Sequence, residues 1–145
     1  MYPVIPDAAA ALRQAFASPE LGEGRVLVAY LFGGYAEGRA HSESDLDVGV
    51  LLDRTRFAGA RERFEEGIRV AAALGRTLAH PRVDLVVLND APPGLAARIA
   101  TEGVVVHCAD AEAEHAFRRD AQLRAADIAP FLRRAREIKL RAIAR

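Results

Sequence analysis

LFGGYAEGRAHSESDLDVGVLL, residues 31–52, is the stretch that decides how this chain folds. It predicts a buried strand that ends at two glycines, then a short polar helix or loop, then a second strand. Asp45 and Asp47 are separated by one residue, so both side chains project from one face of that strand. The other face is filled by apolar side chains: Leu46, Val48, Val50 and Leu52. The stretch therefore predicts an acidic pair at the start of a strand whose opposite face lies in the core.

The acidic pair is a candidate metal site. Two carboxylates at this spacing repel, and each raises the pKa of the other unless a cation lies between them. Mg²⁺ binds carboxylate oxygens and keeps positions open for water and phosphate. Gly33 and Gly34 allow the backbone to approach a ligand closely, and the N–H groups of a short helix after them would attract phosphate. A solvated strand end can carry the same acidic pair, and that alternative stays open.

Two residues between the glycines and the acids are further candidates for nucleotide contact. Arg39 could contact a triphosphate, although an exposed arginine near several acids also serves as a solvated counter-charge. Ser44 directly precedes Asp45 and could bind a carboxylate or a nucleotide, or only form the turn.

A third acid lies in a later apolar run. Residues 82–88, RVDLVVL, predict a strand that contains Asp84. A charge in such a run is costly to bury unless it is paired or bound to metal. If this strand lies beside the one that carries Asp45 and Asp47, Asp84 completes a group of three carboxylates. The alternative is an acid at the sheet edge that faces water.

The rest of the chain alternates helices and strands. Asp7 can cap a helix that follows it, with Leu12 and Phe16 on one face. Further strands are expected at 26–32 and 104–108, and helices at 58–78, 95–101 and from 109 to the end with a break before Pro130. In the helix at 58–78, one side is expected to hold the following residues: Phe64, Ile68, Ala71 or Ala72, and Gly75.

Length and composition indicate one domain. The 145 residues suit a single domain at 1–145, with a core at about 20–108 and a helical segment at about 109–145. The formal net charge is zero, which gives no electrostatic case for direct nucleic-acid binding. One cysteine, no apolar run of membrane-spanning length and no secretory signal lead us to expect a cytoplasmic protein without membrane contact.

The spacing of glycines and acids resembles a known motif. Gly33-Gly34, ten residues and then Asp45-x-Asp47 are similar to the G-S, ten residues, D-x-D signature of the polymerase-beta-like nucleotidyltransferase superfamily. Within it, the chain resembles the minimal nucleotidyltransferases, small antitoxins that act beside a helical HEPN partner. The resemblance implies an α/β fold in which a small mixed sheet is flanked by helices and followed by C-terminal helices.

The same resemblance implies a reaction. Two Mg²⁺ ions would be held by Asp45, Asp47 and Asp84 as catalytic residues, with Gly33 and Gly34 on the phosphates of ATP. AMP would pass from ATP to a tyrosine of a cognate HEPN toxin. This minimal chain must find its acceptor on another molecule, and its homo- or hetero-oligomeric state stays open.

One departure from the signature keeps other functions open. Gly34 stands where the family has a serine whose hydroxyl helps to hold the triphosphate. The chain could therefore be a weakened enzyme, or a non-catalytic antitoxin that acts by binding. A nucleotidyltransferase for a small molecule, completed by a partner subunit, is the third possibility.

The last segment has a candidate docking stripe. Its apolar residues share one side of a helix whose other faces are basic: Phe131, Ala135, Ile138 and Ala142. We expect this stripe to pack on its own domain, and docking of a partner protein or RNA is the alternative.

Overall fold

A four-stranded mixed sheet forms the centre of the molecule, in a computed structural model that describes residues 4–22, 24–41, 43–80 and 82–144. Its strands are β1 (Val26–Phe32), β2 (Leu46–Leu52), β3 (Val83–Val87) and β4 (Val104–Cys108), arranged in the order β3-β2-β1-β4. β1 is antiparallel to both β2 and β4, whereas β2 and β3 run parallel. The α/β fold with a small mixed sheet is confirmed, and each strand is found where the sequence predicts it, to within one residue.

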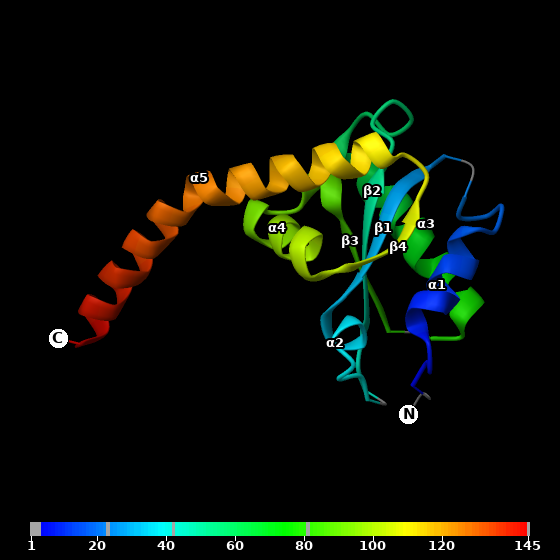
Figure 1. The fold of residues 1–145 in the computed structure, drawn as a ribbon, viewed down its shortest axis with the longest axis horizontal. Helices are drawn as coiled ribbons and strands as arrows, with labels where there is room; N and C mark the ends of the chain where they lie inside the picture. Colours follow the sequence, from blue (N-terminus) through cyan, green and yellow to red (C-terminus); the bar gives the residue numbers. More distant parts are fainter. Residues whose placement is uncertain (1–3, 23, 42, 81, 145) are drawn as a thin grey trace.

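Helices cover both faces of the sheet (Figure 1). They are α1 (Ala8–Phe16), α2 (Gly33–Ala36), α3 (Ala60–Leu78), α4 (Pro93–Glu102) and α5 (Ala111–Ala144), with a 3₁₀ turn, η1 (Leu88–Asp90), after β3. α1 and α3 pack on one face, and α4 with the first part of α5 packs on the other. Since both faces are buried, the strands are apolar without strict alternation.

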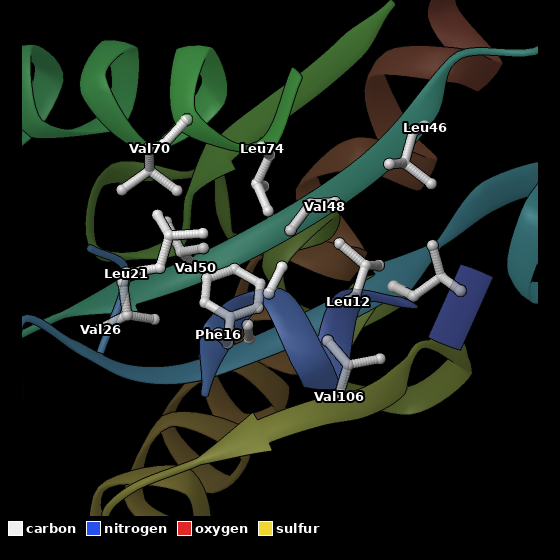
Figure 2. Close-up of a cluster of buried hydrophobic side chains, with 14 of the residues drawn as sticks. Leu12, Phe16, Leu21, Val26, Leu46, Val48, Val50, Val70, Leu74 and Val106 are labelled. Carbon is white, nitrogen blue, oxygen red and sulfur yellow. The ribbon is translucent and has the colours of Figure 1, made fainter. Parts of the chain in front are cut away.

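The larger core lies between the sheet and the pair α1 and α3. Figure 2 shows Leu12 and Phe16 of α1 directed at Val48 and Val50 of β2, which belong to the same buried cluster. The Asp7 carboxylate accepts a hydrogen bond from the Ala10 N–H at 3.0 Å and so caps α1, as predicted. The apolar face of β2 is therefore fixed in the core, and its other face, with Asp47, points toward α4.

The predicted stripe of α3 is wrong. Phe64 and Ile68 are 65% and 57% exposed, and Ala72 is also exposed. The buried side of α3 instead contains Arg63, Glu66, Gly67, Val70, Ala73 and Leu74. Two charged residues can occupy this side because each is paired, Arg63 with Asp90 and Glu66 with two arginines. Apolar periodicity alone therefore selects the wrong face of this helix.

The Arg63–Asp90 pair joins α3 to η1, and its loss should be costly. The guanidinium donates to both Asp90 oxygens at 2.9 Å and to the Phe57 and Ala58 carbonyls. We expect Arg63→Ala to lower the free energy of unfolding by about 3 kcal/mol, since Asp90 and two carbonyls lose their donor. Arg61→Ala, which removes an exposed pair with Glu65, should cost below ~0.5 kcal/mol. Urea denaturation measures both, and equal costs would contradict the role given to Arg63.

The C-terminal helix departs from the sequence prediction in two ways. α5 continues through Pro130, where a break was expected. A proline inside a helix leaves one carbonyl without its N–H donor, and an exposed carbonyl can bond to water instead. Figure 1 shows α5 leaving the body of the molecule and bending beyond its first turns. The expected packing of the Phe131 stripe on its own domain is also wrong, because Phe131 and Ile138 are 68% and 60% exposed.

In the described part of the chain, no helix combines the length and the apolar character needed to cross a membrane.

Candidate active site

The turn after β1 is built around Gly33. Phe32, the last residue of β1, lies opposite Asp47 in the antiparallel register, so the turn begins beside that acid. Gly33 has a φ of 72°, which side chains of L-residues rarely adopt. A Cβ at this position would lie 2.2 Å from Asp47 Oδ2. Two independent constraints, the backbone conformation and the contact with Asp47, therefore require glycine here.

The parallel pairing of β2 and β3 brings two acids together. Asp47 and Asp84 are register partners on neighbouring strands, so their side chains lie next to each other on one face of the sheet. Burial raises the pKa of Asp47 to about 6, and the charges of Asp84 and Asp45 add to this effect. A carboxyl group with such a pKa is one whose charge is poorly compensated by the protein. The pair therefore favours a bound proton or a cation.

Asp45 belongs to the same acidic group, but its carboxylate has a partner. Arg82, two residues before Asp84, places its Nε 3.0 Å from Asp45 Oδ1. With the side chains in this arrangement, no three His, Cys, Asp or Glu residues among those described form a ready metal site. Asp47 and Asp84 are brought together as the sequence predicts, whereas Asp45 is turned to an arginine. Arg82 thus provides Asp45 with a positive charge.

The donor set fits a hard divalent cation. It consists of carboxylate oxygens alone, from two acids that are register partners and one that is paired with an exposed, displaceable arginine. The surplus of negative charge at Asp47 is the feature that a cation would relieve. These residues therefore fit Mg²⁺ by their chemistry.

The other predicted contacts are distributed around this group. Gly34 has open space, because a Cβ would meet only the Arg39 backbone at 4.0 Å. The Arg39 side chain is largely exposed and pairs with Glu37, as a solvated counter-charge would. Ser44 Oγ accepts a hydrogen bond from the His41 N–H at 2.8 Å, which is the turn-forming alternative.

A cavity of about 210 Å³ opens beside Asp47. Its lining combines the turn after β1 with one side of α4 and includes Phe32, Gly33, Asp47, Leu95, Arg98 and Glu102. Sequence reasoning missed Arg98 and Glu102, since a helix separated from the motif by fifty residues gives no sign of where it packs. It also missed Arg82, although its position two residues before Asp84 places both on the same side of a strand.

Comparison with known proteins adds to this geometry. The family model for polymerase beta nucleotidyltransferases matches residues 20–112, which contain all four strands and the acidic group. The chain belongs to this nucleotidyltransferase family. No curated protein sequence matches the chain significantly.

Several solved structures similar to this nucleotidyltransferase are of toxin–antitoxin systems. One is a toxin–antitoxin structure with AMP-PNP, at 22% identity and a TM-score of 0.60, covering 94% of this chain and 98% of the other. A second is a tri-AMPylated HEPN toxin in complex with the MNT antitoxin from Shewanella oneidensis, at 22% identity and a TM-score of 0.52, covering 93% and 91%. At this identity the likeness confirms the fold.

We expect the acidic group to give the nucleotidyltransferase a pH-dependent response to Mg²⁺. The folded-state pKa of Asp47, about 6, lies above the ordinary value of 3.8, so protonation stabilises the folded state. That stabilisation is complete below pH ~4 and is lost as the pH rises through about 6, where a cation can replace the proton. We therefore expect 10 mM MgCl₂ to raise Tm at pH 7.5 and to leave it unchanged at pH 4.5, measured by scanning calorimetry. An equal rise at both pH values would contradict binding at this group.

Proposed function

We propose that this nucleotidyltransferase is an antitoxin that transfers AMP from ATP to a tyrosine hydroxyl of a HEPN toxin. The observation that carries the proposal is the pairing of Asp47 and Asp84 in register, beside Gly33, on a nucleotidyltransferase sheet. The similar structures with AMP-PNP and with an AMPylated HEPN toxin support the choice of nucleotide and acceptor.

The acids would divide the work of binding and proton transfer. Asp45, Asp47 and Asp84 would hold two Mg²⁺ ions, which supply Lewis-acid neutralisation of phosphate charge and lower the pKa of the attacking hydroxyl. Asp84 is exposed, so it can reach an incoming hydroxyl and accept its proton. Arg82, once released from Asp45, carries a positive charge that can pair with a phosphate.

The reaction forms one bond to phosphorus and breaks another. The tyrosine oxygen forms a bond to the α-phosphorus of ATP, and the bond from that phosphorus to the bridging oxygen of the β-phosphate breaks. The proton of the hydroxyl passes to Asp84, and pyrophosphate leaves with the electron pair. Gly33 lies beside Asp47, and the backbone N–H groups of Gly33 and Gly34 would hold the β- and γ-phosphates.

The experiment that tests the proposal measures label on protein. The chain is incubated with α-³²P-labelled ATP, MgCl₂ and the purified cognate HEPN toxin. We expect label on one or more tyrosines of the HEPN protein, identified by peptide mass spectrometry. Label on an added amino sugar or alcohol, with none on protein, would instead indicate a small-molecule nucleotidyltransferase.

Gly34 offers a gain-of-function test of the triphosphate site. A side chain fits at this position without a close contact, so Gly34→Ser adds only the hydroxyl that the family motif provides. A hydrogen bond to a charged group contributes about 1.5–3 kcal/mol, so turnover should rise ~10- to 100-fold. Gly34→Ala is the matched control and should give no rise. If Gly34→Ser is no faster than Gly34→Ala, a hydroxyl at position 34 does not contribute to triphosphate binding.

The second candidate is an antitoxin that inhibits by binding alone. Its support is Gly34 in place of the motif serine, together with the ion pair that engages Asp45. The double variant Asp45→Ala/Asp47→Ala distinguishes the two candidates in an RNase assay of the HEPN protein. Inhibition that survives this double variant, with no label transferred by the native chain, would favour the binding module.

A further inference from the structure

Most of the C-terminal part of α5 lies away from the other described elements of the molecule. Earlier in the helix Ala121 and Phe117 face the body, where Phe117 packs with the core beneath α4. From residue 122 to residue 143 the side chains are exposed or half-buried, with none buried. We call residues 122–144 the α5 arm. Figure 1 shows the arm projecting from the body and bending toward the side on which α4 lies.

The apolar stripe of the arm continues the buried side of the helix. Its members follow one another at alternating spacings of three and four residues: Ile128, Phe131, Ala135, Ile138 and Ala142. Phe117 and Ala121 precede them in the same series, so one helical face runs from the core into solvent, interrupted only at Arg124. On the first part of α5, α4 covers this face and still reaches the start of the arm, where Gln122 donates to Thr101 Oγ1 at 3.4 Å, whereas residues 130–143 are all exposed.

The composition of the stripe is that of a seam between helices. Large side chains at Phe131 and Ile138 alternate with small ones at Ala135 and Ala142. Small residues let a second helix approach closely, and large ones fill the spaces between its side chains. Alanines add little buried apolar area to a membrane-binding face, whereas they let a second helix approach closely.

Charge is segregated between the arm and the body. Residues 122–145 hold seven basic and two acidic side chains, whereas residues 1–121 hold thirteen basic and eighteen acidic ones. Within the described chain, no ion pair joins an arginine of the arm to an acid. Two arms placed side by side would repel, and an acidic surface would be attracted.

We propose that the α5 arm binds a helix of the protein partner, one that presents an apolar stripe with acidic flanks. The partner helix continues along the arm the packing that α4 makes on the first part of α5. The identity of the partner rests on the proposed function, and the docking surface does not depend on nucleotide transfer. The arm thus holds the acceptor protein while the acidic group at β2 and β3 acts on it.

The test measures binding of the purified cognate HEPN toxin by isothermal titration calorimetry in 150 mM NaCl. Phe131→Glu/Ile138→Glu should weaken binding at least ~100-fold, since it places two charges in the seam. Arg133→Gln/Arg136→Gln is the matched control, because it makes the same change in net charge on the side of the helix away from the stripe. It should weaken binding less than ~10-fold, as expected of rim charges. Circular dichroism checks that both variants keep their helix content.

Failure of this inference is distinguishable from failure of the proposed function. Asp47→Asn should bind the HEPN protein like the native chain while transferring no label, and binding without any transfer by the native chain would overturn only the proposed function. If Phe131→Glu/Ile138→Glu binds the HEPN protein as tightly as the native chain does, or if the native chain does not bind it, the docking surface is overturned. The docking surface is also overturned if the stripe serves another contact in place of HEPN binding. Such a contact would be a dimer of this chain that Phe131→Glu/Ile138→Glu disperses, or binding to phosphatidylserine vesicles or poly(U) that the same variant abolishes.

Discussion

Gly33→Ala is expected to reduce AMP transfer at least ~100-fold in a protein that still folds. The added Cβ would lie 2.2 Å from Asp47 Oδ2, so the Asp47 carboxylate or the turn must move by about an ångström. A displacement of that size at a reacting centre costs on the order of 100-fold in rate. The positive φ of Gly33 adds roughly 1–2 kcal/mol of backbone strain for alanine.

Gly34→Ala is the control for this substitution. It makes the same chemical change one residue along the chain, where the nearest atoms lie 4.0 Å from the added carbon. We expect transfer rates within ~3-fold of the native chain, since no contact is disturbed. Initial rates with labelled ATP and Tm values for both variants decide the matter. Comparable losses of rate in the two variants would show that the contact between the added Cβ and Asp47 is not the cause of the loss in Gly33→Ala.

Asp47→Asn is expected to abolish transfer and to stabilise the protein at the same time. The amide keeps the shape of the side chain but gives up the charge needed to hold a cation, so we expect a loss of roughly 1000-fold or more, about 4 kcal/mol of transition-state stabilisation. The amide also removes the repulsion between Asp47 and Asp84 and the cost of partial burial. After allowance for solvent screening, this should raise stability at pH 8 by about 1 kcal/mol, or ~3 °C in Tm.

The pH dependence separates this effect from general stabilisation. At pH 4.5 most of the Asp47 in the native protein is already protonated, so Asp47→Asn should change Tm little. MgCl₂ should also no longer raise the Tm of the variant at pH 8. A Tm gain that is the same at both pH values would assign the stabilisation to packing instead of charge. Retained transfer would remove Asp47 from the catalytic group.

The central part of the fold and the pairing of two of the acids were predictable from sequence. Strands with continuous apolar runs, such as 26–32 and 104–108, have few alternatives in a chain of this length. The alternation of apolar residues around Asp47 predicted that its side chain points away from the buried face of the strand. Asp84 lies in an apolar run, where a carboxylate needs a partner. The parallel register then set these two side chains against one another.

What sequence could not predict depended on partners distant along the chain. The buried face of α3 includes Arg63 because Asp90, twenty-seven residues later, pairs with it. The pairing of Asp45 with Arg82 likewise depends on how β3 docks, which the local pattern around Asp45 does not specify. The exposure of the arm depends on the absence of a covering element, and periodicity shows only that a helix has an apolar side.

The pairing of Asp47 with Asp84 has a consequence for folding. β1 and β2 form an antiparallel pair closed by a short connection, whereas β3 can join β2 only after the whole of α3 has crossed over. Contacts separated by longer stretches of chain form later, because more conformational entropy must be lost first. The hairpin with Gly33 and Asp47 can therefore assemble before its acidic counterpart arrives, and Mg²⁺ affinity should appear during refolding together with the β2–β3 ladder.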